Sequence, residues 1–388
     1  MRDWTEEQHD LRAGIGRWCD ALNEGYPERE RNAAFDRDAW KLVCESGVLG
    51  LPFGSQWGGL DQSLLTTMFV LDELGYRCRD GGLGFSVTTH MVSAGVPVQR
   101  YGSAALKDRY LPGICDGSTI GAHAISEPDS GSDALAMRTT AVRRDGDWVV
   151  SGSKTFVSNG PVADVFVIYV RTDPAAGPLG VTALLVERDT PGLTVGGPIE
   201  KMGLKTSPFA EVFLDDCVVP AANVVGRPGS GFLVLDHVMK WEILCSFIVN
   251  VGQMRHRVDR CVEYARGRTQ FGSPIGSFQA VANKIVDMRI GADTAGKWLY
   301  DTAERLERGE NVTVDIAISK LLASESNVAS ALAAIQVFGG NGYTTEYGLE
   351  AELRNAVAGT IYSGTSDIQR NRIARMLGLD KKKSLERT

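Results

Sequence analysis

The stretch WVVSGSKTFVSNG, residues 148–160, decides the fold, together with three similar stretches that follow it: ADVFVIYVRT (163–172), GVTALLVER (180–188) and AEVFLDD (210–216). Each stretch is short and rich in β-branched residues, and turn residues separate them at regular intervals, which is typical of β-strands. No long helical pattern lies between them, which disfavours a doubly wound parallel sheet. The sequence therefore predicts a central antiparallel β domain over residues 119–230.

Helical patterns flank this β region on both sides. Residues 1–118 carry apolar side chains at three- and four-residue spacing, for example from Asp36 and from Ser63 onward. Residues 231–388 contain three long helical patterns, at 232–266, 277–307 and 312–337. We therefore predict an α+β protein of three domains, with an N-terminal helical domain, the central antiparallel β domain and a C-terminal helical bundle domain.

The composition excludes several classes of function. The net charge of −7 disfavours nucleic acid as a partner, because phosphate binding needs a basic face. The short basic run Lys381–Lys383 is interpreted as a solvated tail. No stretch approaches eighteen uninterrupted apolar residues, so we expect no membrane span, and the N-terminus does not resemble a secretion signal. We expect a cytoplasmic location.

The cysteines and histidines do not indicate a metal site. The seven cysteines are odd in number and form no C-x-x-C pair, and the five histidines show no metal-binding spacing. We therefore predict reduced thiols and no catalytic metal.

Several loops suggest a nucleotide cofactor, although the common G-x-G-x-x-G signature and the P-loop are missing. The loops 126–133 and 152–160 are dense in hydroxyls and glycines, and each is either a plain turn or a source of hydrogen bonds for a flavin. Arg268-Thr-Gln-Phe-Gly272 offers a cation for a pyrophosphate, and Gly339-Gly-Asn-Gly342 offers backbone N–H groups. Tyr362-Ser-Gly-Thr-Ser366 precedes a short helix whose N-terminus favours a phosphate or a carbonyl oxygen.

These segments occur in the order and spacing of the acyl-CoA dehydrogenase family, which the chain resembles over nearly its whole length. Further motifs of the resemblance are WGGL at 57–60, YLP at 110–112 and GTSDIQR at 364–370. The resemblance implies an N-terminal helical domain, a central β domain and a C-terminal four-helix bundle. It also implies FAD as the cofactor and a homodimer or homotetramer.

The resemblance also implies the cofactor contacts, position by position. Ser126 and Ser132 would line the flavin or substrate loop, Ser158 would hydrogen-bond near flavin N5, and Phe156 would pack against the ring. The adenosine diphosphate part of FAD would be met from the neighbouring subunit by Arg268, Gln270, Phe271 and Gln279. The cofactor would be contacted from the other side by Gln336, Gly339, Gly340, Thr365 and Asp367. A site shared in this way would make oligomerisation obligatory for cofactor binding.

The family's reaction removes two hydrogens from an acyl thioester. A carboxylate takes the α-proton, the β-hydrogen leaves as hydride to flavin N5, and the thioester carbonyl is polarised. Many members place the base, a glutamate, directly before Gly-Thr-Ser, where this chain has Ser363. A serine side chain has no useful basicity at neutral pH, but the Ser363 backbone N–H can still polarise the carbonyl.

Glu242 is the predicted substitute for the missing base. Its neighbours three and four positions away include no cation, so we expect a poorly solvated carboxylate with a raised pKa. In the family, isovaleryl-CoA and long-chain members hold their base on this helix. The alternatives are a surface glutamate paired with Lys240 or Arg255, or a different base such as Glu346 or Asp367.

The same helix raises the question of what carries the acyl group. Family members that bind coenzyme A often have an aspartate two residues before the base and an arginine just after it. This chain has Lys240 and Ile243 there. We therefore put forward an acyl carrier protein bearing phosphopantetheine as the alternative to coenzyme A. The expected electron acceptor is an electron-transfer flavoprotein or a similar acceptor. The alternatives are a flavin-dependent oxidase or monooxygenase on the same fold, and a binding protein that has lost the chemistry.

Overall fold

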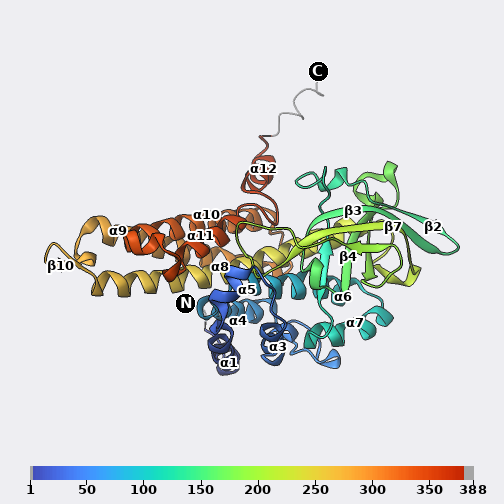
Figure 1. Ribbon diagram of the computed structural model, residues 1–388. Helices are drawn as coiled ribbons and strands as arrows, with labels where there is room; N and C mark the ends of the chain where they lie inside the picture. The colour runs from blue at the N-terminus through green and yellow to red at the C-terminus, as the bar shows by residue number, and fades with distance from the viewer. Residues whose placement is uncertain (1–2, 380–388) are drawn as a thin grey trace, which may run out of the picture.

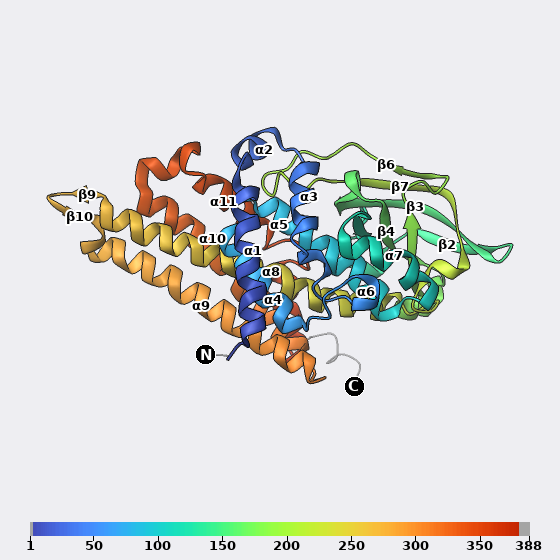
Figure 2. The same cartoon turned by 90° about the horizontal axis from the view of Figure 1, so that it is seen from below.

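The computed structural model describes residues 3–379, which form two helical parts and a β part (Figures 1 and 2). The basic run Lys381–Lys383 lies outside the described residues. Figure 1 shows the β part at one end of an elongated molecule and the tips of the long C-terminal helices at the other.

The N-terminal part is helical. Its helices are α1 (Glu6–Asn23), α2 (Tyr26–Asn32), α3 (Arg37–Glu45), α4 (Leu64–Arg77), α5 (Gly81–Thr88), α6 (Val96–Tyr101) and α7 (Ala104–Asp116). The side chains of Asp36 and Ser63 accept backbone N–H groups at the starts of α3 and α4, as N-cap residues do. A π-helical turn, Thr89–Gly95, follows α5 directly. Such turns are rare and are frequent at functional sites.

The β part is one eight-stranded sheet. Its strands are β1 (Gly121–Ala124), β2 (Thr140–Arg144), β3 (Asp147–Ser158), β4 (Val165–Arg171), β5 (Val181–Glu187), β6 (Leu193–Val195), β7 (Phe209–Val219) and β8 (Val224–Val225). Their order is β6-β7-β3-β2-β4-β5-β8, with β1 paired to β4. The antiparallel prediction needs one correction, because β1 runs parallel to β4 and one residue pair joins β2 to β4 in parallel. The chain passes through β2 and β3 before it reaches β4, which permits this parallel pairing.

Up to residue 379, the C-terminal part has three long α-helices and two shorter ones. These are α8 (Gly231–Gly267), α9 (Gln279–Glu307), α10 (Thr313–Phe338), α11 (Leu349–Ala358) and α12 (Ser366–Met376). A two-stranded hairpin, β9 (Thr269–Gln270) and β10 (Ser273–Pro274), lies at the tip of the α8–α9 turn (Figure 1). By length and composition, Thr313–Tyr343 could cross a membrane, but α10 packs against α8 and α9 as a core helix of the bundle.

Helix α8 is held against α4 by two glycines. A Cβ atom at Gly75 would lie 2.1 Å from the Val249 carbonyl oxygen, and one at Gly252 would lie 2.1 Å from the Asp72 carbonyl oxygen. The two backbones therefore touch directly, which only glycine permits. This contact fixes α8 relative to the N-terminal part of the chain.

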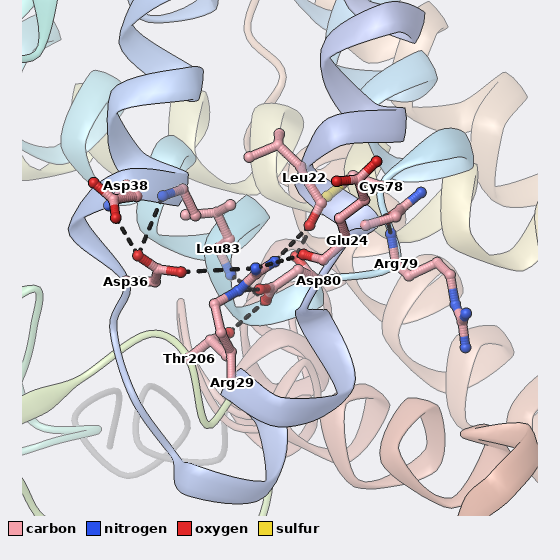
Figure 3. Close-up of polar contacts among 12 residues, drawn as sticks. Leu22, Glu24, Arg29, Asp36, Asp38, Cys78, Arg79, Asp80, Leu83 and Thr206 are labelled. Atoms are coloured by element: carbon pink, nitrogen blue, oxygen red, sulfur yellow. Dashed lines mark hydrogen bonds and ion pairs between the residues drawn. The ribbon is translucent and has the colours of Figure 1, made fainter.

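The buried carboxylate of Asp80 contacts three segments, which are α2, α5 and the loop before β7. Figure 3 shows Asp80 between Arg29 of α2 and Thr206 of the loop before β7. The Asp80 carboxylate accepts from Leu83 N at 2.9 Å and from the Thr206 hydroxyl, and it lies 3.3 Å from Arg29 Nε. It therefore caps α5 and joins the β part to the N-terminal helices.

Candidate active site

Glu242 lies near the middle of the molecule, on the buried face of α8. Its side chain is almost enclosed, with 7% of the residue surface exposed. Ser363 Oγ donates a hydrogen bond to Glu242 Oε1 at 2.5 Å, and Ser93 Oγ donates one to Oε2 at 3.0 Å. His123 Nε2 lies 3.5 Å from the same Oε2. The carboxylate is thus held by groups from the π-helical turn, β1 and the loop before α12.

The alternative interpretations of Glu242 do not match this geometry. Lys240 pairs with Asp236 at 2.6 Å, and Arg255 pairs with Asp72 at 2.6 Å, so neither cation reaches Glu242. Glu346 and Asp367, the other candidate bases, are both exposed. Among the described carboxylates proposed as bases, Glu242 alone is buried beside the Gly-Thr-Ser loop.

Ser363 takes part in the site through its side chain as well as its position. The prediction from sequence concerned only its backbone N–H, and the hydrogen bond from its hydroxyl to Glu242 was missed. Its φ is 53°, in the left-handed region that non-glycine residues rarely adopt. The buried Gln369 donates to the Ser363 carbonyl oxygen at 2.9 Å and supports this conformation. Backbone strain of this kind is frequent at active sites.

A small pocket lies beside α8, beginning one helical turn after Glu242. Ser246, Asn250 and Gln253 follow Glu242 on the same face of the helix, at spacings of three or four residues. They line the pocket together with Gly81 and Gly84 of α5. Ser246 Oγ donates to Thr88 Oγ1 at 3.1 Å. This face of α8 is therefore polar for about three turns beyond the carboxylate.

Of the two segments predicted to contact a flavin, residues 126–133 form a loop, whereas residues 152–158 belong to strand β3. Phe156 has φ 55° and leaves 64% of its surface exposed, so its aromatic face is open to a ligand. Ser158 ends β3 and is partly buried, Ser126 is partly buried, and Ser132 is exposed. These positions are compatible with a flavin site. The assigned contacts stay predictions.

A buried ion pair fixes the loop that contains Ser126. Lys154 Nζ lies 2.7 Å from Glu127 Oε1, and Lys154 is fully buried. The Glu127 carboxylate also accepts from the backbone N–H groups of Arg138 and Thr139. Burial lowers the pKa of Lys154 to about 8, against the opposing effect of Glu127. The ion pair anchors the loop to β3.

A second candidate cofactor site lies at the tips of the long helices. A cavity of about 530 Å³ is lined by Arg268, Gln270, Phe271, Gly339 and Gly340, among other residues. Phe271 is 95% exposed, and a Cβ at Gly339 or Gly340 would meet no atom within 4 Å. An open aromatic ring, a guanidinium and bare backbone suit the nucleotide half of FAD. The residues present therefore fit this cofactor.

The predicted contacts of Arg268 and Gly339 on two sides of FAD stay predictions, because the walls of one cavity can contact a ligand from two sides. Arg268 and Gly339 line the same cavity. The reason is that α8 and α10 both run outward, so that their C-terminal ends meet at the same tip.

The other predicted contacts fall outside this cavity lining. Gln279 and Gln336 are exposed at its edge, where they neighbour lining residues in sequence. Thr365 and Asp367 lie at the start of α12, beside Ser363. Thr365 caps that helix by accepting from Ile368 N at 3.2 Å.

The two cofactor regions are far apart within one chain. The helix between Glu242 and Arg268 spans about 39 Å at a rise of about 1.5 Å per residue. Figures 1 and 2 both place β9 and β10 at the opposite end of the molecule from the sheet. One FAD molecule is too short to reach both regions of the same chain.

Comparison with family models covers nearly the whole chain. Residues 5–118 match the acyl-CoA dehydrogenase N-terminal domain, residues 122–217 match the middle domain, and residues 229–378 match the C-terminal domain.

Individual relatives are similar over almost their full length. The chain is 39% identical to an L-prolyl-[peptidyl-carrier protein] dehydrogenase from Serratia sp. (strain ATCC 39006), over 97% of each chain. It is 34% identical to an acyl-CoA dehydrogenase of Bacillus subtilis (strain 168), over 90% of this chain and 91% of the relative.

Solved structures are similar too. The prolyl acyl carrier protein oxidase AnaB is 38% identical, with a TM-score of 0.94 over 97% of this chain and all of that one. A structure of PigA with FAD and proline is also 38% identical, with a TM-score of 0.95 over 98% of this chain and 99% of that one.

Proposed function

Because the chain belongs to the acyl-CoA dehydrogenase family, we propose that it oxidises an aminoacyl thioester held by a carrier protein. The enzyme is FAD-dependent and dehydrogenates acyl thioesters. The single observation that supports the catalytic assignment is the buried Glu242 carboxylate, held by two hydroxyl donors beside the Gly-Thr-Ser loop.

Glu242 acts as the base in this proposal. Its carboxylate takes the proton from the α-carbon, while a hydride leaves the β-carbon and the Cα–Cβ single bond becomes double. The flavin, when bound, accepts the hydride. The hydroxyl groups of Ser363 and Ser93 hold the two carboxylate oxygens in one orientation, which limits the geometry from which the proton is taken. The Ser363 backbone N–H is the proposed donor to the thioester carbonyl.

Polar side chains beside α8 support the proposal of a phosphopantetheine arm. Asn250, Gln253 and Asn355 line the small pocket there, and their amide groups can both donate to and accept from the amides of such an arm. The substitutions Lys240 and Ile243 remove charges that coenzyme A-binding members often have near the base. Two relatives named L-prolyl-[peptidyl-carrier protein] dehydrogenase, 39% and 38% identical, favour a carrier protein over coenzyme A.

Anaerobic titration with thioesters tests the carrier. We expect a prolyl group on a phosphopantetheinylated carrier protein to reduce the flavin at least about tenfold faster than the same group on coenzyme A, a difference of about 1.4 kcal/mol. The measurement is the bleaching of flavin absorbance in a stopped-flow instrument. Equal rates from the two carriers would contradict the carrier-protein assignment, and no bleaching by any thioester would contradict the function.

We also propose that each active site is shared between two chains. The support is the distance of about 39 Å along α8 between Glu242 and the cavity at Arg268. The cavity of one chain would then hold the nucleotide half of an FAD whose flavin lies beside the partner's Glu242. A dimer with two such sites is the simplest symmetric arrangement.

Complementation between an FAD-binding variant and a variant of the base, assayed at an FAD concentration that leaves Arg268→Ala largely without cofactor, tests the shared site. Arg268→Ala is expected to weaken FAD binding about 10- to 100-fold, because it removes a charged hydrogen bond to phosphate, and Arg266→Ala in the last turn of α8 serves as the control. Co-expression of Arg268→Ala with Glu242→Gln chains is expected to restore roughly a quarter of wild-type activity, since half of random dimers carry one intact site. If the site lies within one chain, the mixture stays inactive.

Two expectations from the sequence stay predictions. These are the electron-transfer flavoprotein as acceptor and the cytoplasmic location. One solved relative is named as an oxidase, so the alternative is that oxygen reoxidises the reduced flavin directly. Peroxide formed in amounts equal to the oxidised substrate, when the titrated enzyme is opened to air, would favour the oxidase.

A further inference from the structure

Two buried polar groups beside Glu242 are not used by the proposed mechanism. Tyr169 of β4 is fully buried, and its hydroxyl has no hydrogen-bond partner among residues 3–379. His123 of β1 also has a buried Nδ1 atom without a partner in the described part of the chain. A buried polar atom without a partner costs free energy, so such atoms are rare and call for an explanation.

The two side chains share one face of the sheet. His123 pairs with Val167 in the β1–β4 register, and Tyr169 follows two residues later on the same strand. Side chains two residues apart point to the same face of a strand. The two rings meet edge to face, with their centroids 6.4 Å apart. The negative charge of Glu242 acts on both groups. Burial lowers the pKa of His123 and Glu242 opposes this effect, whereas burial and Glu242 both raise the pKa of Tyr169.

The position of the proton on His123 follows from Glu242. Burial lowers the pKa of His123, so its ring is neutral at neutral pH. A neutral imidazole carries one N–H, and the carboxylate at 3.5 Å from Nε2 is an acceptor only, which favours the proton on Nε2. Nδ1 then carries a lone pair and can accept a hydrogen bond from a ligand. The Tyr169 hydroxyl can donate or accept.

We propose that His123 Nδ1 and the Tyr169 hydroxyl are specificity determinants that bind an N–H group on the α-carbon of the acyl substrate. The inference rests on the proposed function and deepens it, because it names the groups that select an aminoacyl over a plain acyl chain. The nitrogen of such a substrate is bonded to the same carbon from which Glu242 takes the proton. His123 Nε2 lies 3.5 Å from Glu242 Oε2, so the proposal places the nitrogen of a substrate whose α-proton Glu242 takes beside the His123 ring.

Substrate analogues that differ in one ring atom test the proposal. The wild-type enzyme is titrated with prolyl, cyclopentanecarbonyl and tetrahydrofuran-2-carbonyl thioesters on the same carrier protein, which present N–H, CH₂ and an acceptor-only oxygen. We expect kcat/KM to favour the prolyl group over both analogues by at least about tenfold. Tyr169→Phe and His123→Phe are each expected to reduce this preference about 3- to 10-fold, while FAD content stays unchanged.

Tyr110→Phe is the matched control. Tyr110 belongs to the same buried cluster, but its hydroxyl already donates to Glu187 Oε1 at 2.9 Å. Tyr110→Phe should therefore lose some thermal stability and keep the substrate preference. Tyr169→Phe should keep its thermal stability, because no hydrogen bond within the described residues is removed.

The outcomes separate this inference from the function on which it rests. A prolyl preference that stays within about twofold of wild type in both variants overturns the assignment of His123 and Tyr169 and leaves the function standing. Faster flavin reduction by the cyclopentanecarbonyl thioester than by the prolyl thioester in the wild type overturns it as well. No flavin reduction by any thioester overturns the proposed function itself.

Discussion

Glu242→Gln is expected to keep the fold and the bound FAD and to lose flavin reduction by the thioester by about 10²–10⁴-fold, the usual contribution of a positioned base. Glutamine has nearly the same shape, and its amide oxygen can accept from one of the two serine hydroxyls while its NH₂ group donates to the other, so the packing around α8 should survive. It cannot take the α-proton. The measurement is single-turnover bleaching of the flavin under anaerobic conditions, with FAD content determined in parallel.

Glu263→Gln provides the control for this experiment. Glu263 lies on the same helix, but its side chain is exposed to solvent. The same chemical change at that position should leave the rate of flavin reduction within about twofold of wild type, because isolated surface charges contribute little. A Glu242→Gln enzyme that reduces its flavin at the normal rate would show that another group is the base.

Lys154→Met is expected to destabilise the protein by about 3–5 kcal/mol, the usual cost of removing one partner of a buried ion pair. Methionine fills much of the volume of lysine, but the buried Glu127 carboxylate would lose its cation at 2.7 Å. The hydrogen bonds that Glu127 accepts from Arg138 N and Thr139 N would remain, which places the expected cost nearer the lower end of the range. Urea denaturation measures this change in the free energy of unfolding.

Two further variants show whether the cost comes from the unpaired carboxylate. Adding Glu127→Gln to Lys154→Met removes the buried charge and should recover part of the lost stability, as a double-mutant cycle. Lys240→Met breaks the more exposed ion pair to Asp236 and should cost at most about 1 kcal/mol. Equal losses from Lys154→Met and Lys240→Met would contradict the assigned role of the buried pair.

The long helices could be located well from the sequence. The pattern predicted at 232–266 corresponds to α8, Gly231–Gly267, and the pattern at 312–337 corresponds to α10, Thr313–Phe338. Glycines next to both helices and long periodic apolar patterns give strong local signals. By contrast, β1 has only four residues, Gly121–Ala124, and its strand state depends on pairing with β4, more than forty positions away. A local pattern does not contain that information.

The candidate base could be located because the chain lacks a glutamate at position 363, which directed attention to Glu242. The groups around the carboxylate could not be found in the same way. Ser93 lies 149 positions before Glu242 in sequence, and it reaches the carboxylate from a π-helical turn that no periodic pattern reveals. His123 and Tyr169 come together only when β1 pairs with β4. Tertiary structure, rather than local sequence, creates these contacts.

Helix α8 is continuous from Glu242 to the nucleotide cavity. It therefore fixes both the distance and the relative rotation of the two sites. Inserting a single residue between Gly252 and Tyr264 would turn everything beyond it by about 100° and shift it by about 1.5 Å. Arg268 would then point away from the tip of α10, although neither site had been altered directly. Homologous chains should therefore tolerate substitutions along this helix far better than changes in its length.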